Sequence, residues 1–188
     1  MNAKSTYDTA LCYWLTGLSG AGKTTLAQKF AGELRKKGFG VLVLDGDTLR
    51  ARLNRDLGFG REGRAESVRR AAEIARVAVD SGLVVVAALV SPYAEDRRVA
   101  RDIVGDHRFI EVFIDASLET CMTRDPKGLY QRAQAGLIPE FTGISSPYER
   151  PDAPTLHIVT DDRPDADGVD LLLTHFEHRL RMSADTLI

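Results

Sequence analysis

Cysteine is nearly absent from this chain of 188 residues, which holds only two. Cys12 and Cys121 lie far apart, both in apolar surroundings, and form no CxxC pair. This pattern argues against a disulfide framework and leaves catalysis by a thiol without support. We expect both cysteines to be small residues of the core.

A strong charge imbalance and a long apolar run are missing as well. The formal net charge is only −2, which gives no reason to expect nucleic acid or a membrane as a partner. The longest apolar run, at 83–90, is too short to span a bilayer. The first ten residues lack the apolar stretch of a signal peptide. We therefore expect a cytoplasmic protein.

What remains is an ordinary globular composition, with 44% hydrophobic and 28% charged residues, which fits one compact domain over 1–188. Short apolar runs alternate with stretches of helical periodicity, and an acidic stretch at 161–167 is expected to be a solvated turn. Strands are predicted at 12–16, 41–44, 83–89, 109–114 and 156–160. Helices are predicted at 25–37, 48–53, 65–81, 94–104, 118–124 and 168–182. This order predicts an α/β fold, a three-layer sandwich with a mainly parallel sheet of about five strands and helices on both faces.

The segment 125–154 does not fit the alternation of strands and helices. It has few periodic apolar positions and several glycines and prolines. About thirty residues without regular structure is long for a compact domain, and such loops usually form lids or binding segments. We predict a mobile lid over about 125–149.

A glycine-rich loop between the first strand and the first helix is the clearest functional motif. Residues 17–24, GLSGAGKT, fit the pattern G-x-x-x-x-G-K-[ST] in the strand–helix context that the motif requires. Glycines let the backbone turn its N–H groups toward phosphates, and the helix directs its positive end at them. Lys23 is expected to contact the β- and γ-phosphates, and the Thr24 hydroxyl is expected to ligate Mg²⁺. The predicted ATP site therefore comprises Gly17, Leu18, Ser19, Gly20, Ala21, Gly22, Lys23, Thr24 and Thr25.

Two sequence features that other classes of phosphate-loop protein use are absent. The chain has no NKxD sequence, so recognition of guanine has no support. The apolar run at 83–90 ends in Ser91 and Pro92, whereas a Walker B strand ends in an acid. Acids instead follow the neighbouring strand, at Asp45 and Asp47, from where carboxylates can approach both Mg²⁺ and an acceptor hydroxyl. This arrangement favours a small-molecule kinase with a P-loop kinase fold over a GTPase.

Several longer motifs carry a specific resemblance. They are GLSGAGKTT (17–25), DGDTLR (45–50), NRDLGF (54–59), RDPKGLY (124–130) and FTGISSPYE (141–149). With them, the chain resembles the adenylylsulfate kinase family over about residues 12–160. The resemblance implies Mg²⁺-dependent transfer of phosphate from ATP to the ribose 3′-hydroxyl of adenylylsulfate, in sulfate assimilation. It also implies a homodimer, and it allows a functional link to an ATP sulfurylase.

The resemblance assigns catalytic roles to Lys23, Asp47 and Ser91. Asp47 is the candidate to deprotonate the acceptor hydroxyl and, with Thr24, to hold the metal, with Asp45 in a supporting role. The alternative for Asp47 is the N-cap of a helix beginning at Thr48. Ser91 occupies the position of a family serine once assigned as a phosphorylated intermediate. Because direct in-line transfer needs no such intermediate, we favour a binding role for Ser91.

The resemblance also assigns binding residues. Arg50 and Arg64 are expected to hold the phosphosulfate, since the planar guanidinium pairs with anionic oxygens at two points. Phe59 and Phe141 are expected to sandwich the acceptor adenine. Arg124 and Lys127 are expected beside ATP. The predicted acceptor site comprises Asp45, Arg50, Phe59, Arg64, Ser67, Val90, Ser91 and Phe141.

The sequence departs from the family pattern mainly on the acceptor side. Thr48 and Ser67 stand where many members have asparagine, and Gly63 and Ser145 stand where an acid is usual. Serine offers one short hydroxyl in place of an amide. Two alternatives therefore stay open: a kinase for another nucleotide with an anionic tail, and a nucleotide-dependent regulatory protein without catalysis. Intact Lys23 and Asp47 argue against the second.

Overall fold

The computed structural model describes residues 10–161 and 166–185, so the first nine residues and part of the acidic stretch lie outside it. The elements follow one another as β1 (Cys12–Thr16), α1 (Lys23–Lys36), β2 (Val41–Asp45), α2 (Gly46–Ala51), α3 (Arg61–Asp80), β3 (Val84–Ala88), α4 (Ala94–Val104), β4 (Phe109–Asp115), α5 (Leu118–Arg124), α6 (Leu129–Gln134), β5 (Leu156–Val159) and α7 (Ala166–Asp185). No helix in these ranges is both long and apolar enough to cross a membrane.

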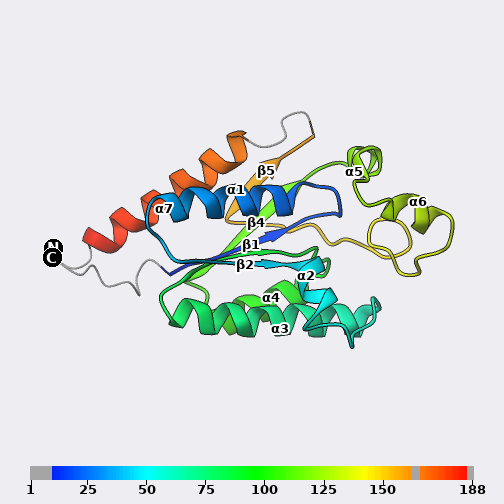
Figure 1. Cartoon of the computed structure of the whole chain (residues 1–188), viewed down its shortest axis with the longest axis horizontal. Helices are drawn as coiled ribbons and strands as arrows, with labels where there is room; N and C mark the ends of the chain where they lie inside the picture. The colour runs from blue at the N-terminus through cyan, green and yellow to red at the C-terminus, as the bar shows by residue number, and fades with distance from the viewer. Residues whose placement is uncertain (1–9, 162–165, 186–188) are drawn as a thin grey trace.

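The five strands form one parallel sheet in the order β2-β3-β1-β4-β5. Helices α1 and α7 cover one face of the sheet, and α3 and α4 cover the other (Figure 1). The predicted three-layer α/β fold is therefore confirmed. Because the strands are parallel, their carboxyl ends all lie at one edge, where ligands bind in sheets of this kind.

Each face of the sheet has its own core. Along β1, Tyr13 and Leu15 pack into the cluster under α1 and α7, whereas Cys12 and Trp14 pack into the cluster over α3 and α4. This alternation follows from the two-residue period of a strand. Burial on both faces explains why the strands read as continuous apolar runs. Both cysteines are buried and free, as expected.

Several predicted bounds shift by one to three residues, and the largest differences are in α3 and α6. Helix α3 begins at Arg61, four residues before the predicted 65, because its first turn, Arg-Glu-Gly-Arg, has no apolar residue to reveal the helical period. Helix α6 lies within the segment predicted to be irregular. Only Tyr130 and Ala133 of this helix are buried, which is too few for a periodic signal.

A buried ion pair lies beneath the carboxyl edge of the sheet. Arg97 on α4 and Glu111 on β4 are both nearly inaccessible to solvent, and Arg97 Nε donates to Glu111 Oε1 at 2.8 Å. Arg97 also donates to the Ser91 carbonyl at 2.9 Å, and Arg101 donates to the second oxygen of Glu111 at 3.1 Å. The pair thus connects α4 and β4 to the segment that follows β3.

Replacing Arg97 by methionine should lower the free energy of unfolding by about 3–5 kcal/mol, because it leaves a buried carboxylate with one partner fewer. The matched control is Arg98→Met. Arg98 is 60% exposed and pairs with surface acids, so its loss should cost less than about 1 kcal/mol. Urea unfolding followed by circular dichroism measures both. Equal effects of the two substitutions would contradict the structural role of the buried pair.

Candidate active site at the carboxyl edge of the sheet

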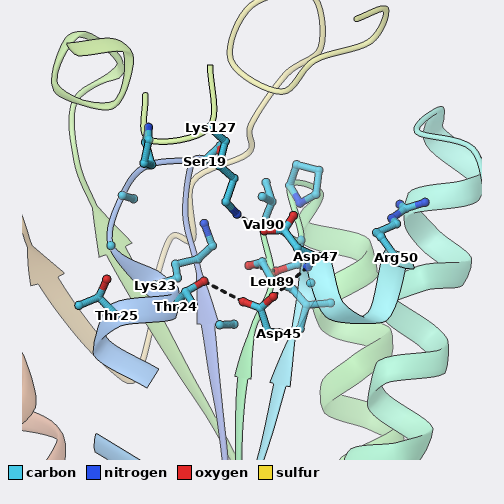
Figure 2. A pocket seen from close by; sticks show the side chains of 18 of the residues that line it. Ser19, Lys23, Thr24, Thr25, Asp45, Asp47, Arg50, Leu89, Val90 and Lys127 are labelled. Atoms are coloured by element: carbon cyan, nitrogen blue, oxygen red, sulfur yellow. Dashed lines mark hydrogen bonds and ion pairs between the residues drawn. The ribbon is translucent and has the colours of Figure 1, made fainter. Parts of the chain in front are cut away.

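A pocket of about 520 Å³ opens at the carboxyl edge of the sheet. Its walls come from the loops after β1, β2 and β3, from the start of α3 and from the segment after α5. In Figure 2, Lys23 and Thr24 lie on one side of Asp47 and Arg50 lies on the other. The predicted site residues that line it are Ser19, Gly20, Ala21, Gly22, Lys23, Thr24, Thr25, Asp45, Asp47, Arg50, Phe59, Arg64, Ser67, Val90, Ser91, Arg124 and Lys127.

The glycines of the phosphate loop serve two different needs. Gly22, with φ 99°, has a backbone conformation that side chains disfavour, and it directly precedes α1. Gly17 is required for space, because a Cβ there would lie 2.3 Å from the Ile114 carbonyl oxygen of β4. Gly17 and Leu18 do not line the pocket; their carbonyls accept from Lys23 Nζ at 2.9 and 2.7 Å.

Lys23 is 8% exposed, and burial lowers its pKa to about 8. Its ammonium group is held at the loop by the two carbonyls and lies within the pocket lining. An anionic ligand would supply the countercharge that this buried cation lacks. The loop is therefore suited to bind a polyphosphate.

The junction of β2 and α2 is tied to the phosphate loop by Asp45. Its Oδ2 accepts from the Thr24 hydroxyl at 2.8 Å, and its Oδ1 accepts from the backbone N–H groups of Asp47 and Thr48, both at 3.1 Å. Asp45 is therefore the N-cap of α2, which begins at Gly46. The alternative that Asp47 caps a helix beginning at Thr48 is wrong. The Asp47 carboxylate is free of a capping role and forms an ion pair with Lys127 (Figure 2).

The oxygen atoms of this corner fit Mg²⁺ in kind and number. Thr24 contributes a hydroxyl, and Asp45 and Asp47 contribute carboxylates, all lining one pocket. In residues 10–161 and 166–185 no group of three or more histidine, cysteine or acidic side chains forms a metal cage. Mg²⁺ does not need one, because it is usually held by one or two protein oxygens, waters and substrate phosphates.

Ser91 is held in a constrained conformation. Its φ is 38°, in the left-handed region, and the residue is 3% exposed. Trp14 Nε1 donates to its hydroxyl at 3.1 Å, and the hydroxyl is 3.4 Å from the Leu89 carbonyl. Arg97 donates to the Ser91 carbonyl, so both the side chain and the backbone of Ser91 are held by hydrogen bonds. Its hydroxyl is therefore already engaged within the protein, which suits a positioning role better than that of a nucleophile.

At the other end of the pocket, three residues provide positive charge and an aromatic face. Arg50 lies 4.7 Å from the centre of the Phe59 ring, and Phe59 is 55% exposed. Arg64 donates to the Glu140 carbonyl at 2.7 Å, which connects α3 to the segment 125–149. An exposed aromatic ring with a guanidinium over it, in a pocket that Arg64 also lines, is suited to a planar base with an anionic tail.

The segment 125–149 contacts the site at several points. Tyr130 donates to the Ser19 carbonyl at 2.9 Å, and Arg124 donates to the carbonyls of Thr160 and Asp161. Phe141 does not line the pocket; it is partly buried and lies edge-on to Tyr130, with ring centres 5.0 Å apart. The predicted pairing of Phe59 with Phe141 is therefore not formed in this conformation.

The end of the same segment is anchored. The hydroxyls of Tyr148 and Thr16 are 3.0 Å apart, and Thr16 donates to the Val90 carbonyl at 2.7 Å. The Glu149 carboxylate accepts from the Ala94 N–H at 2.7 Å, at the start of α4. The Ser-Pro-Tyr-Glu part of the FTGISSPYE motif thus serves to attach this segment to the sheet.

Comparison with known proteins identifies the family. The adenylylsulphate kinase family model matches residues 9–159. The adenylyl-sulfate kinase of Paraburkholderia xenovorans is 51% identical over 170 residues, covering 90% of this chain and 94% of that protein. The chain belongs to the adenylylsulfate kinase family. The structure of Mycobacterium tuberculosis APS kinase CysC in complex with AMPPNP and APS has a TM-score of 0.83 at 43% identity, covering 92% of this chain and 98% of that one.

Some adenylylsulfate kinase relatives are much longer. The bifunctional enzyme NodQ of Rhizobium sp. is 48% identical over 160 residues, which are 85% of this chain but 25% of that protein. The chain therefore spans about a quarter of the length of such relatives.

Several residues that position the segments of the candidate site were missed by sequence reasoning. Arg97, Thr16, Trp14 and Tyr130 all hold site segments without matching a phosphate-binding motif. The one available signal was Glu111, an acid within the apolar run 109–114, because a charge in a buried strand requires a partner.

Lys23→Ala should reduce the rate of phosphoryl transfer by about a hundredfold to a thousandfold, because the ammonium group would stabilise charge that develops on the transferred phosphoryl group. The control is Lys36→Ala, which removes a 74% exposed ammonium from the same helix and should leave turnover unchanged. Release of ADP measures turnover, and thermal unfolding verifies the fold. Wild-type turnover in folded Lys23→Ala would show that the phosphate-loop assignment is wrong.

Asp47→Asn should lower kcat by at least about a hundredfold, the usual scale for loss of a positioned base. Asp102→Asn, which neutralises a surface carboxylate 61% exposed on α4, is the control. The two variants are compared by steady-state kinetics at saturating substrates. A normal kcat with a lowered melting temperature would assign Asp47 a structural role instead.

Ser91→Ala should keep kcat within about tenfold of wild type, because direct in-line transfer does not need the hydroxyl. With ATP labelled on the γ-phosphate, no acid-stable phosphoenzyme should form in the wild type. Stoichiometric label on Ser91 that passes into product would contradict this prediction.

Proposed function

We propose that this protein transfers the γ-phosphoryl group of ATP to the ribose 3′-hydroxyl of adenylylsulfate. The observation that carries the proposal is the order of groups along one pocket. The phosphate loop lies at one end, Arg50 lies at the other with its guanidinium over the Phe59 ring, and Asp47 lies between them (Figure 2). Membership of the adenylylsulfate kinase family supports the same activity.

At the donor end, Lys23 and the N-terminus of α1 are placed to bind the β- and γ-phosphates. Thr24, with Asp45 and Asp47 near it, would hold Mg²⁺, which would neutralise charge on the phosphate oxygens. Arg124 and Lys127 would lie along the nucleotide. On binding of ATP, Lys23 would exchange the Gly17 and Leu18 carbonyls for phosphate oxygens. Lys127 would exchange the Asp47 carboxylate for phosphate oxygens in the same way.

At the centre, Asp47 would accept the proton of the 3′-hydroxyl. The hydroxyl oxygen then forms a bond to the γ-phosphorus, while the bond between that phosphorus and the β–γ bridging oxygen breaks and leaves ADP. Asp47 can take the proton only after its carboxylate leaves the ion pair with Lys127. Ser91 and Val90 would contact the acceptor from the end of β3.

At the acceptor end, Phe59 would stack on the adenine and Arg50 and Arg64 would hold the phosphosulfate. Phe141 would complete the stack if the segment 125–149 acts as a lid that closes over bound nucleotides. The Arg64–Glu140 contact lies within this segment, and the anchor at Tyr148 and Glu149 lies at its end.

We further propose a single cytoplasmic kinase domain over 1–188 that forms a homodimer. One relative, the APS kinase of Thiobacillus denitrificans, is described as hexameric, and it is 28% identical with a TM-score of 0.64. Light scattering of the purified protein would determine its own oligomeric state. A functional link to an ATP sulfurylase is consistent with the substrate, because that reaction class forms adenylylsulfate from ATP and sulfate.

A coupled assay for ADP release tests the activity. The wild type is supplied with ATP, Mg²⁺ and, in separate reactions, adenylylsulfate and a panel of nucleotides with other anionic tails. Turnover that depends on adenylylsulfate supports the proposal. Turnover with another nucleotide but not with adenylylsulfate would assign a different acceptor, and no turnover with any of them would indicate a regulatory protein.

Phe141→Ala should raise the KM for adenylylsulfate by about tenfold to a hundredfold, the equivalent of one lost base stack of roughly 1–3 kcal/mol. The affinity for ATP in the absence of acceptor should barely change. The control is Leu137→Ala, a 68% exposed residue of the same segment. Steady-state kinetics and titration calorimetry with ATP distinguish the two effects. An unchanged KM for the acceptor would exclude Phe141 from the acceptor site.

A further inference from the structure

The loop between α2 and α3 lies against one side of α3. Arg70 forms a paired contact with the Asp56 carboxylate, both at 2.8 Å, and donates to the Leu53 carbonyl at 3.0 Å. Asn54 Nδ2 donates to the Ser67 hydroxyl at 2.9 Å. Positions 63, 67 and 70 are spaced four and three residues apart, so they share one face of the helix. We refer to Gly63, Ser67 and Arg70 as the packing face of α3.

Gly63 brings the loop closest to the helix. A Cβ at this position would lie 2.3 Å from the Gly58 carbonyl oxygen and 2.9 Å from its carbonyl carbon. Such distances do not occur between real atoms, and both atoms belong to backbone, so the loop itself would have to move. The φ of Gly63 is not in the left-handed region, so glycine is needed here for space and not for its backbone freedom.

Ser67, one turn further along α3, also allows the loop to lie close to the helix. Both Ser67 and Asn54 are buried, at 6% and 1% exposed. The other amide atom of Asn54, Oδ1, is buried and has no hydrogen-bond partner within the described ranges. A longer side chain at 67 would have to displace Asn54 or extend into the pocket that Ser67 lines. The short side chain therefore keeps Asn54 against the helix.

The position of this loop determines where the acceptor groups lie. Arg50 donates to the carbonyls of Leu57 and Gly58 at 3.2 and 2.7 Å, and it lies 3.4 Å from the Gly63 carbonyl. The same guanidinium lies over the Phe59 ring. A shift of residues 57–60 away from α3 would therefore move Arg50 and Phe59 together. The phosphate loop lies against β4 through Gly17 and would stay in place.

We infer that Gly63 and Ser67 are specificity-determining positioning residues, which set how Phe59 and Arg50 meet the acceptor. The inference rests on the proposed function, because it assigns these groups to the acceptor site. It explains two departures from the family pattern as one structural feature, a close approach of the loop to α3. The substrate class is a nucleotide whose base stacks on Phe59 and whose anionic tail pairs with Arg50.

Gly63→Ala tests the inference with a single methyl group. The KM for adenylylsulfate should rise by at least about tenfold, because the displaced Phe59 ring would lose the stacking that contributes roughly that much to binding of a base. The kcat and the affinity for ATP should stay within about twofold, since the donor end is untouched. The control is Gly32→Ala, which adds the same methyl to α1, where nothing lies within 4 Å of the added atom.

Asn54→Ala provides a second variant, which removes atoms from the same contact and should also raise the acceptor KM selectively. If Gly63→Ala does not fold, Asn54→Ala decides alone. An acceptor KM within twofold of wild type in a folded variant, or a parallel loss of ATP affinity, would overturn the inference. The measurements use whichever nucleotide the wild type phosphorylates, so failure of the packing-face role is distinguishable from failure of the adenylylsulfate assignment.

Discussion

The parallel direction of all five strands is the constraint on which the site depends. It brings the carboxyl ends of β1, β2 and β3 to one edge, although they are separated by many residues along the chain. The phosphate loop follows β1, Asp45 and Asp47 lie at the junction of β2 and α2, and Ser91 follows shortly after β3. Helices on both faces keep the strands fixed and dry, so the edge is where polar groups can gather around a ligand.

Cross-connections between these loops give the edge its defined geometry. Asp45 links the phosphate loop to α2 through Thr24, and Arg97 links Ser91 to β4 through Glu111. The Arg97 connection pairs groups that are buried and need a partner, whereas the Asp45 connection joins two partly buried side chains. The two ends of the pocket are built differently. The donor end is built from the phosphate loop on the sheet, whereas the acceptor end depends on a loop lying against α3.

The sequence predicts regular elements well and cross-connections poorly. The bounds of α4 and α5 were predicted correctly, because local residues define them: α4 ends before Gly105, and the Ser117 side chain caps the start of α5. The N-cap of α2 is Asp45, whereas the sequence offered Asp47 as the alternative N-cap. Two acids so close together give the same local signal, and only the hydrogen bonds of the structure distinguish them. The position of Phe141 against Tyr130 depends on how the whole segment 125–149 folds. The close approach of Gly63 to Gly58 depends on packing at atomic distance. No spacing rule contains that information.

If one pocket directs the γ-phosphoryl group of ATP to the 3′-hydroxyl of adenylylsulfate, the position of the new phosphate on the product decides the matter. Phosphorus NMR of the product that the wild type forms from ATP and adenylylsulfate determines that position. We expect a new phosphomonoester resonance coupled to the ribose H3′, in amounts equal to the ADP formed. A phosphomonoester at another position, or ADP with inorganic phosphate only, would contradict it.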